Sequence, residues 1–262
     1  MIDYETTVTT PDGVIDAFVA RPAAAAPPVI LYMDVWGLRR ELFDIARRIA
    51  GQGYYCILPN LYYRQGKIRF EFRDEQGRAI SMTKLAPEKR EQVRQQLRQL
   101  SDAMVIDDTR DILQFIKGDG ASPGPVGSVG FCMGGRHAMC AAAHYPQMQA
   151  TASLHGTLLV NDTPLSPHKF ADRFQGEIYG GFAEHDDLAP TTTINTLAEA
   201  LGGRTNVTYT FAVHPGIVHG YSLPDRDVYD EAATERDWSS IFAMLARRLA
   251  RASSNAAEPG MP

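Results

Sequence analysis

Short, continuous apolar segments alternate with helical segments along this chain, and this alternation constrains its fold more than any other feature. Residues 29–33 and 54–58 are apolar runs of strand length, and apolar side chains recur at helical spacing over about residues 39–50. Continuous apolar runs are typical of strands buried on both faces of a parallel sheet. The three segments therefore predict a strand–helix–strand unit, whose crossover is right-handed in nearly all proteins.

The alternation continues along the rest of the chain. The pattern predicts strands at about 125–130, 150–154, 177–182 and 206–213, and helices at about 87–100, 103–117, 133–143, 193–201 and 229–251. Two segments rich in β-branched residues flank Pro11-Asp12-Gly13 and predict a hairpin over about residues 5–20. Strands that alternate with helices predict an α/β fold, with a mostly parallel central sheet flanked by helices on both faces.

The length and the lack of a linker favour one large domain. A chain of 262 residues without internal repeats is compatible with a single α/β unit. We expect this domain over residues 1–252 and a disordered tail over 253–262. A polar excursion at about 64–101 interrupts the alternation. Its helix is interpreted either as a solvated surface element or as the border of a substrate cleft, since binding residues often lie on loops.

Composition excludes several classes of protein. The formal net charge of −5 argues against a nucleic-acid-binding domain, and no apolar run approaches the roughly 18 residues of a membrane span. The acidic N-terminus lacks the features of a signal peptide. Cys56, Cys132 and Cys140 form no CxxC pair. We therefore expect a cytoplasmic protein with free thiols and with no nucleic-acid or membrane partner.

The segment Gly130-Phe131-Cys132-Met133-Gly134-Gly135 lies between a predicted strand and a predicted helix. It has the layout of a nucleophile elbow, with cysteine where serine is more common. The strand-to-helix turn is sharp, so the residues two before and two after the nucleophile are glycines, which have no side chain to clash. A thiol at a helix N-terminus is favoured as the reactive thiolate by the helix dipole. We therefore interpret Cys132 as a nucleophile rather than as a structural cysteine.

A cysteine nucleophile needs a base and an acid, which follow an elbow in the chain order nucleophile, acid, histidine. Asp186 and Asp187 follow a predicted strand and are the candidate acids, with Glu184 as a third. An acid at the carboxyl end of a strand lies where such sheets collect their active sites. His219, in a loop before Gly220, is the candidate base, whereas His214 lies nearer a strand and is interpreted as structural.

The other histidines are weaker candidates. His137 is expected to pack inside the elbow helix, His144 to lie near its end, and His155 could border the cleft because it ends a predicted strand. No cluster has the spacing of zinc ligands, and no glycine-rich phosphate loop is present. For the oxyanion, one expected donor is the backbone N–H of Met133, and the other comes from the loop over residues 34–37.

Taken together, these motifs resemble the dienelactone hydrolase family of the α/β-hydrolases. Five stretches between about Pro28 and Leu249 carry the resemblance, at residues 33–37, 58–64, 130–135, 183–186 and 215–220. It implies an α/β-hydrolase fold and a triad of Cys132, Asp186 and His219. It also implies an oxyanion hole formed by the amides of Val35 and Met133. It implies a cofactor-free and usually monomeric enzyme, so we expect no cofactor, no metal, and a monomer or small homo-oligomer.

The resemblance also suggests substrate-binding residues. Arg64 matches an arginine that binds the substrate carboxylate, and Trp36 is a further candidate contact. Asp34 stands where the family's type enzymes carry a glutamate that modulates the nucleophile, and it is one methylene shorter. A second carboxylate-binding arginine of those enzymes falls on Leu223 here, with Arg226 three residues later.

The sequence therefore predicts a hydrolase that cleaves a carboxylic ester, most simply a lactone, through an acyl-enzyme on cysteine. Its substrate would be a small ester or lactone, with or without a carboxylate. A broad small-ester esterase or thioesterase is an alternative, which the missing second arginine favours. A catalytically retired homologue that binds small molecules is another, although the order of the three candidate catalytic residues argues against it.

Overall fold

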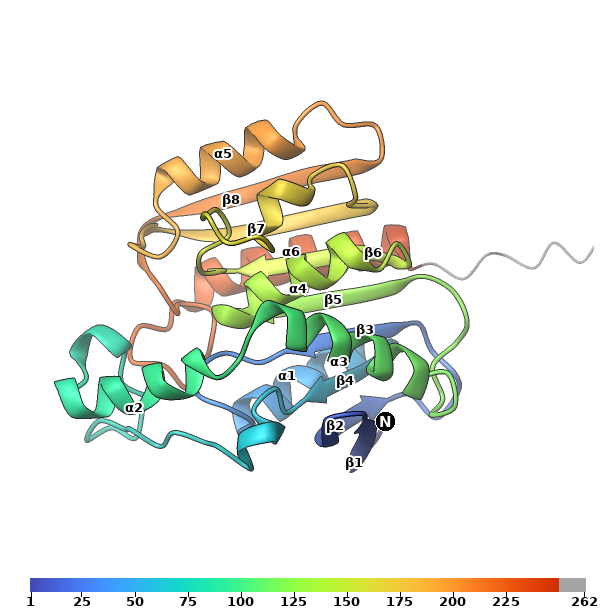
Figure 1. The fold of residues 1–262 in the computed structure, drawn as a ribbon, viewed down its shortest axis with the longest axis horizontal. Coiled ribbons are helices and arrows are strands. Elements are labelled where there is room, and N and C mark those ends of the chain that lie inside the picture. The colour runs from blue at the N-terminus through green and yellow to red at the C-terminus, as the bar shows by residue number, and fades with distance from the viewer. Residues whose placement is uncertain (250–262) are drawn as a thin grey trace, which may run out of the picture.

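The predicted alternation builds an eight-stranded sheet in residues 1–249, which are the residues that the computed structural model describes (Figure 1). The order across the sheet is β1-β2-β4-β3-β5-β6-β7-β8. Strands β1 and β2 pair antiparallel, as do β2 and β4, and every later pair is parallel. The strands are β1 (Ile2–Thr10), β2 (Gly13–Arg21), β3 (Pro28–Tyr32), β4 (Tyr55–Pro59), β5 (Val126–Phe131), β6 (Met148–Leu154), β7 (Gly176–His185) and β8 (Val207–Val218).

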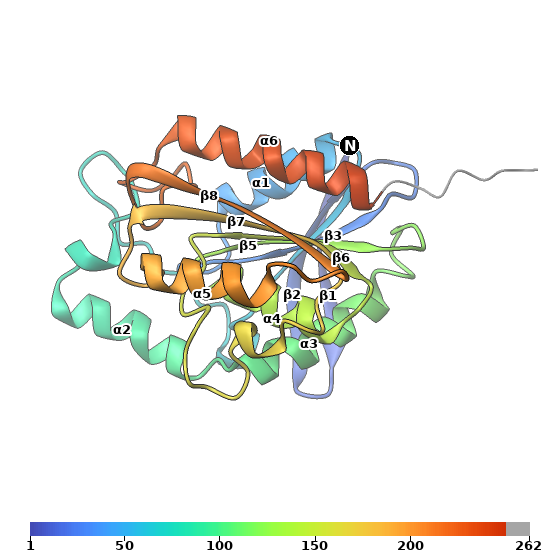
Figure 2. The same cartoon turned by 90° about the horizontal axis from the view of Figure 1, so that it is seen from above.

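Helices cover both faces of this sheet (Figure 2). Helices α1 and α6 lie on one face, and α3, α4 and α5 lie on the other. The predicted fold class is confirmed. The helices are α1 (Arg40–Gly51), α2 (Pro87–Arg98), α3 (Asp102–Phe115), α4 (Met133–His144), α5 (Thr191–Leu201) and α6 (Glu231–Arg248), with short 3-10 turns at Tyr63–Gln65, Met82–Lys84 and Pro167–Phe170.

The strand β8 differs most from its prediction. It was expected to end at Val213, but it continues to Val218 and so contains Pro215 and Gly216. Pro215 is tolerated because β8 is an edge strand, where a missing N–H need not break a ladder, and the Gly216 N–H donates to the Glu184 carboxylate at 2.7 Å. A register shift then pairs His185 of β7 with Val218. The two strands therefore end together, immediately before Asp186 and His219.

The polar excursion between β4 and α3 folds over the loops at the carboxyl edge of the sheet. Its residue Phe70 donates its N–H to the Trp36 carbonyl at 3.1 Å, and Ala79 donates to the Asp225 carbonyl at 2.7 Å. Helix α2 is mostly exposed, and Val93 is its buried residue. The helix of the excursion is thus a mostly exposed element, and a role as the border of a substrate cleft stays a prediction.

The sequence predicts a final helix over about residues 229–251, followed by a tail. The final helix α6 begins at Glu231 after an N-cap at Asp230, whose side chain accepts the Ala233 N–H. The expected tail over residues 253–262 lies outside the described residues, as do the last two residues of the predicted helix. Within residues 1–249, no helix is both long enough and apolar enough to cross a membrane.

The turn between β5 and α4 depends on glycine because backbone atoms approach it closely. A Cβ atom at Gly134 would lie 2.4 Å from the Tyr32 carbonyl oxygen, and one at Gly130 would lie 2.0 Å from the Gly134 carbonyl oxygen. Real Cβ contacts do not come so close, and backbone atoms cannot move aside as a flexible side chain can. These two glycines therefore allow α4 to pack against the end of β3.

This packing yields a prediction for stability. Gly134→Ala should lower the free energy of unfolding by about 3 kcal/mol, because the added methyl group overpacks against backbone. Gly51→Ala is the matched control, since a Cβ at Gly51 meets no atom within 4 Å. It should leave stability unchanged or raise it by up to about 1 kcal/mol. Urea unfolding of the two variants tests the difference, and equal stability would contradict the close approach.

Candidate active site

The backbone at Cys132 has the strained geometry of an elbow. This residue has a φ of 56°, in the left-handed region that non-glycine residues seldom adopt, and it is the N-cap of α4. Its N–H donates to the Leu154 carbonyl at 3.0 Å, and its carbonyl accepts the N–H groups of Gly135 and Thr157. Hydrogen bonds from β6, α4 and the following loop thus hold the residue in this conformation.

The structure brings together the three residues expected to form a triad. His219 Nε2 lies 3.2 Å from the Cys132 sulfur, and His219 Nδ1 lies 2.7 Å from Asp186 Oδ2. The second Asp186 oxygen accepts the Leu188 N–H at 2.9 Å, which orients the carboxylate. The other two candidate acids do not contact His219: Asp187 is exposed, and Glu184 accepts the Gly216 N–H at 2.7 Å.

The partners of His219 determine its charge. Burial disfavours the imidazolium, but the sulfur of Cys132 and the carboxylate of Asp186 outweigh this effect and raise the pKa of His219 to about 10. The two ring nitrogens face a carboxylate oxygen and the Cys132 sulfur, and these are the two groups that favour a proton on the imidazole.

The two backbone N–H groups predicted to form the oxyanion hole have no hydrogen-bond acceptor among residues 1–249 and are free to donate. Met133 is the first residue of α4, where no intrahelical partner exists for the N–H. Val35 lies in the loop after β3, and none of the hydrogen bonds in residues 1–249 uses its N–H. Tyr62 donates its hydroxyl to the Val35 carbonyl at 3.1 Å and so fixes this loop. Sequence reasoning did not assign a role to Tyr62.

Asp34 is committed to partners other than the thiol. Its two oxygens accept hydrogen bonds from Arg39 at 2.6 and 3.0 Å, and one of them also accepts the Trp36 N–H at 3.1 Å. The carboxylate is fully buried, and no hydrogen bond in the described part of the chain joins it to Cys132. The expected modulation of Cys132 by Asp34 is therefore not supported by a hydrogen bond between them.

Arg64 was expected to bind a substrate carboxylate, but its guanidinium binds two carboxylates of the protein. Its guanidinium donates two hydrogen bonds to Asp12, at 2.7 and 3.0 Å, and two to Asp108, at 2.8 and 2.9 Å. It also stacks on the Tyr63 ring at 4.4 Å. Four of its five N–H groups are thus used, and Arg64 ties the N-terminal hairpin to α3 rather than presenting a free fork to a substrate.

A different arginine lies beside the three residues. The guanidinium of Arg226 stacks on the Trp36 ring at 4.8 Å and lies near Gly220, next to His219. It is 5% exposed, and its Nε has no hydrogen-bond partner. Burial lowers the pKa of Arg226, and the negative charges of Asp34 and Cys132 partly offset this. The buried indole N–H of Trp36 also lacks a partner.

The other histidines considered as candidates contact groups other than the Cys132 sulfur. His137 is buried inside α4, where desolvation lowers its pKa to about 4. His144 bonds the Cys140 carbonyl at the end of the same helix. His214 bonds Asp237 at 2.7 Å inside the protein, as its structural interpretation requires. His155 is buried directly beside His219. Among the described residues, no group of three or more histidine, cysteine and acidic side chains is arranged to hold a metal ion.

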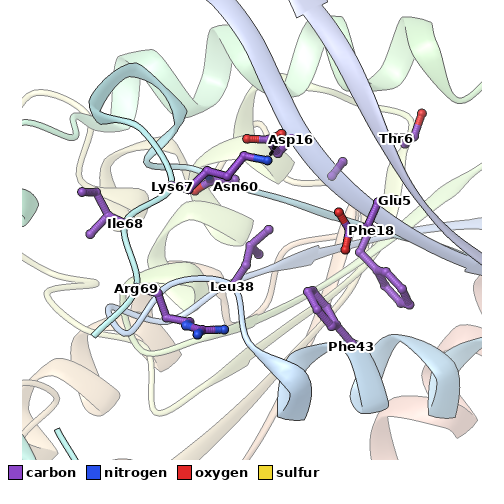
Figure 3. A pocket seen from close by; sticks show the side chains of 11 residues that line it. Glu5, Thr6, Asp16, Phe18, Leu38, Phe43, Asn60, Lys67, Ile68 and Arg69 are labelled. Atoms are coloured by element: carbon purple, nitrogen blue, oxygen red, sulfur yellow. Dashed lines mark ion pairs between the residues drawn. The ribbon is translucent and has the colours of Figure 1, made fainter. Parts of the chain in front are cut away.

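A cavity of about 350 Å³ lies between β2, α1 and the start of the polar excursion (Figure 3). Phe18 and Phe43 stack at 4.5 Å on one side of it, and Lys67 pairs with Asp16 at 3.0 Å on another. None of the three candidate catalytic residues lines this cavity. It is therefore separate from the site described above.

Comparisons with known proteins identify relatives that align over most of the chain. A Salmonella typhi protein with the provisional name carboxymethylenebutenolidase is 27% identical, over 92% of this chain and 91% of its own length. A Synechocystis protein with the same provisional name is 28% identical, over 95% of this chain and 99% of its own. The crystal structure of a Klebsiella pneumoniae protein, provisionally described as a dienelactone hydrolase, matches with a TM-score of 0.80 and 26% identity. It covers 94% of this chain and 98% of that one.

The sequence profile of the dienelactone hydrolase family matches residues 15–249, which is most of the chain. The family resemblance, the fold class and the expected type of enzyme, an ester hydrolase, are thereby confirmed. The chain belongs to the dienelactone hydrolase family.

Proposed function

We propose that this protein hydrolyses a carboxylic ester or a lactone through an acyl-enzyme on Cys132. The observation that carries the proposal is the hydrogen-bonded chain from the Cys132 sulfur through His219 to Asp186, with distances of 3.2 and 2.7 Å. A nucleophile, a base and an orienting acid in this order are what acyl transfer requires. The provisional name of the relatives supports a lactone, since a butenolide is one.

The first half of the reaction forms the acyl-enzyme. His219 Nε2 takes the thiol proton as the Cys132 sulfur attacks the carbonyl carbon, and the carbonyl electron pair moves onto oxygen. The N–H groups of Val35 and Met133 stabilise this oxyanion, at about 3 kcal/mol for one such donor. The intermediate then collapses, the C–O bond breaks, and the departing oxygen takes the proton from His219 Nε2. In a lactone the departing oxygen stays attached to the acyl chain.

The second half releases the product. His219 takes a proton from a water molecule as that water attacks the thioester carbon. The same two N–H groups stabilise the second oxyanion, and the C–S bond breaks to return the thiolate. Asp186 holds Nδ1 throughout, which keeps the ring aligned and stabilises its charged form. A simple ester yields an acid and an alcohol, and a lactone yields one hydroxy acid.

Arg226 is the best-supported anchor for a carboxylate on the substrate. Arg39 alone satisfies both Asp34 and Asp225, with hydrogen bonds of 2.6 to 3.2 Å, whereas Arg226 lies 3.9 Å from Asp34. A buried guanidinium with an unused N–H is costly to maintain unless an anion binds to it. The carboxymethylene group in the relatives' provisional name also supports an anionic substrate.

The role of Cys132 yields the first test of this function. Cys132→Ala should lower turnover of a chromogenic acetate ester by about 10⁴-fold or more while the protein stays folded. Wild-type protein quenched with acid during turnover should carry the acyl mass on the peptide that contains Cys132. Iodoacetamide should label Cys132 before Cys56 and Cys140, because burial raises the pKa of both other thiols.

Three outcomes of this test would contradict the proposal. Turnover by Cys132→Ala would show that Cys132 is not the nucleophile. First labelling of another cysteine would show that the Cys132 thiol is not unusually reactive. An absence of turnover on every ester and lactone, with a folded wild type, would favour a retired hydrolase that binds small molecules.

The role of Asp186 can be tested against its neighbour. Asp186→Asn should reduce kcat by about 10³- to 10⁴-fold, because the amide loses the charge that supports His219 and disturbs its tautomer. Asp187→Asn is the matched control, since Asp187 is exposed and should leave kcat unchanged. Steady-state kinetics on one ester compare the two variants. A larger loss in Asp187→Asn would mean that the acid is wrongly assigned.

The carboxylate anchor predicts a change in substrate preference. Arg226→Gln should lower kcat/KM for a carboxylate-bearing lactone by about 10- to 100-fold, as expected for one charge-assisted hydrogen bond. Hydrolysis of a neutral ester should be unaffected. The ratio of the two kcat/KM values is the measurement. An unchanged ratio would contradict the anchor and favour a general esterase.

Arg64→Gln is the control for this experiment. It should leave the ratio unchanged but lower the free energy of unfolding by up to about 3 kcal/mol, because it leaves the buried Asp108 carboxylate without its ion pair. A changed ratio in this variant would restore the role first expected for Arg64.

A further inference from the structure

The imidazole of His155 lies against the ring of the proposed base, and the mechanism above does not use it. The two ring centroids are 4.9 Å apart, with an interplanar angle of 73°, so the contact is edge to face. His155 is fully buried, and its ring also contacts Tyr221 at 5.5 Å and Phe131 at 6.1 Å. The His219 ring therefore packs on the His155 ring, which is itself held among buried aromatic side chains.

The backbone of His155 connects this surface to the elbow. The residue follows β6 with a φ of 38°, a left-handed conformation, and its N–H donates to the Gly181 carbonyl at 2.7 Å. The residue before it, Leu154, accepts the Cys132 N–H, and Thr157 donates to the Cys132 carbonyl. The same short segment thus holds the backbone of the nucleophile and carries the ring that contacts the base.

The side chain of His155 is also tied to the loop that carries the base. Its Nε2 lies 2.8 Å from the hydroxyl oxygen of Ser222, three residues after His219, and this serine is fully buried. One hydrogen bond thus sets the orientation of the His155 ring relative to the His219 loop. Packing on Tyr221 and Phe131 restricts the remaining freedom of the ring.

The ring next to His219 is neutral. Burial lowers the pKa of His155 well below its ordinary value, and the positive charges of His219 and Arg226 act in the same direction. A neutral ring can remain in contact with the imidazolium of His219 without repelling it. The contact therefore persists whether or not His219 carries its second proton.

We propose that His155 is a positioning residue that holds the ring of His219 with Nε2 directed at the Cys132 sulfur. The edge-to-face contact blocks rotation of the base away from the sulfur, and the hydrogen bond to Ser222 keeps the blocking ring in place. This inference rests on the proposed function for its effect on turnover. Its effect on the thiol requires only the geometry between His219 and Cys132.

The test uses two variants that differ in what they remove. His155→Asn deletes the ring while keeping a residue that tolerates the left-handed backbone. Ser222→Ala keeps the ring and deletes only its tether. His137→Asn is the matched control, because His137 is an equally buried histidine that contacts Asp102 rather than the triad.

Two readouts distinguish positioning from a general loss of structure. His155→Asn should lower kcat by about 10- to 100-fold with little change in KM, the cost expected when a catalytic group is misplaced by about 1 Å. The rate of Cys132 alkylation by iodoacetamide below pH 8 should fall with it, because a misaligned His219 no longer supports the thiolate. Ser222→Ala should show both effects more weakly, and His137→Asn should show neither.

The opposite results would overturn the inference. Wild-type alkylation rates across pH in both folded variants would mean that His155 does not align the base. Equal losses in His137→Asn would mean that any buried histidine has the same effect. If His155→Asn does not fold, wild-type behaviour of Ser222→Ala alone would count against the tether and the proposal. Alkylation needs no substrate, so a failure of the proposed hydrolase function would leave this readout intact.

Discussion

The close approach of α4 to the ends of β3 and β5 is the constraint on which the site depends. Carbonyl oxygens lie so near Gly134 that no side chain fits there. The same turn forces Cys132 into a left-handed conformation and puts its sulfur at the start of α4. Because the sheet is parallel from β4 to β8, the loops that follow β3, β7 and β8 reach the same edge. The loops after β7 and β8 bring Asp186 to His219 and His219 to this sulfur.

The arginines discussed above differ in how far protein carboxylates use their N–H groups. Arg39 bridges two buried carboxylates with four hydrogen bonds and satisfies both. Arg64 likewise bridges two carboxylates with four hydrogen bonds, the exposed Asp12 of the hairpin turn and the buried Asp108 of α3. Arg226 is buried without comparable partners. Of these three arginines, Arg226 is the one with a buried N–H group that no atom of residues 1–249 accepts.

Much of the fold follows from periodicity, because continuous apolar runs and helical spacing report directly on burial. The glycine spacing also indicated the elbow, and the chain order indicated His219. The choice of Asp186 over Asp187 came from the family resemblance, because spacing alone does not separate two adjacent acids. The extension of β8 through Pro215 was not, because it depends on β8 being an edge strand. The partners of Arg64 were not predictable either, since Asp12 and Asp108 approach it only in three dimensions. Burial of Arg226 is likewise a property of the packed loops.

A histidine–aspartate pair is not sufficient to define the site, because the protein contains a second one. His214 lies 2.7 Å from Asp237, the same distance as in the first pair, and this aspartate also accepts the hydroxyls of Tyr179 and Tyr221. This second pair joins β8 to α6, and within residues 1–249 no thiol forms a hydrogen bond with the His214 ring. The Tyr221 ring contacts both His214 and His155, and His155 contacts His219. A row of buried rings thus connects the proposed base to a carboxylate whose hydrogen bonds are all internal. In the described part of the chain, ring contacts, not a chain of hydrogen bonds, therefore link His219 to the pair of His214 and Asp237.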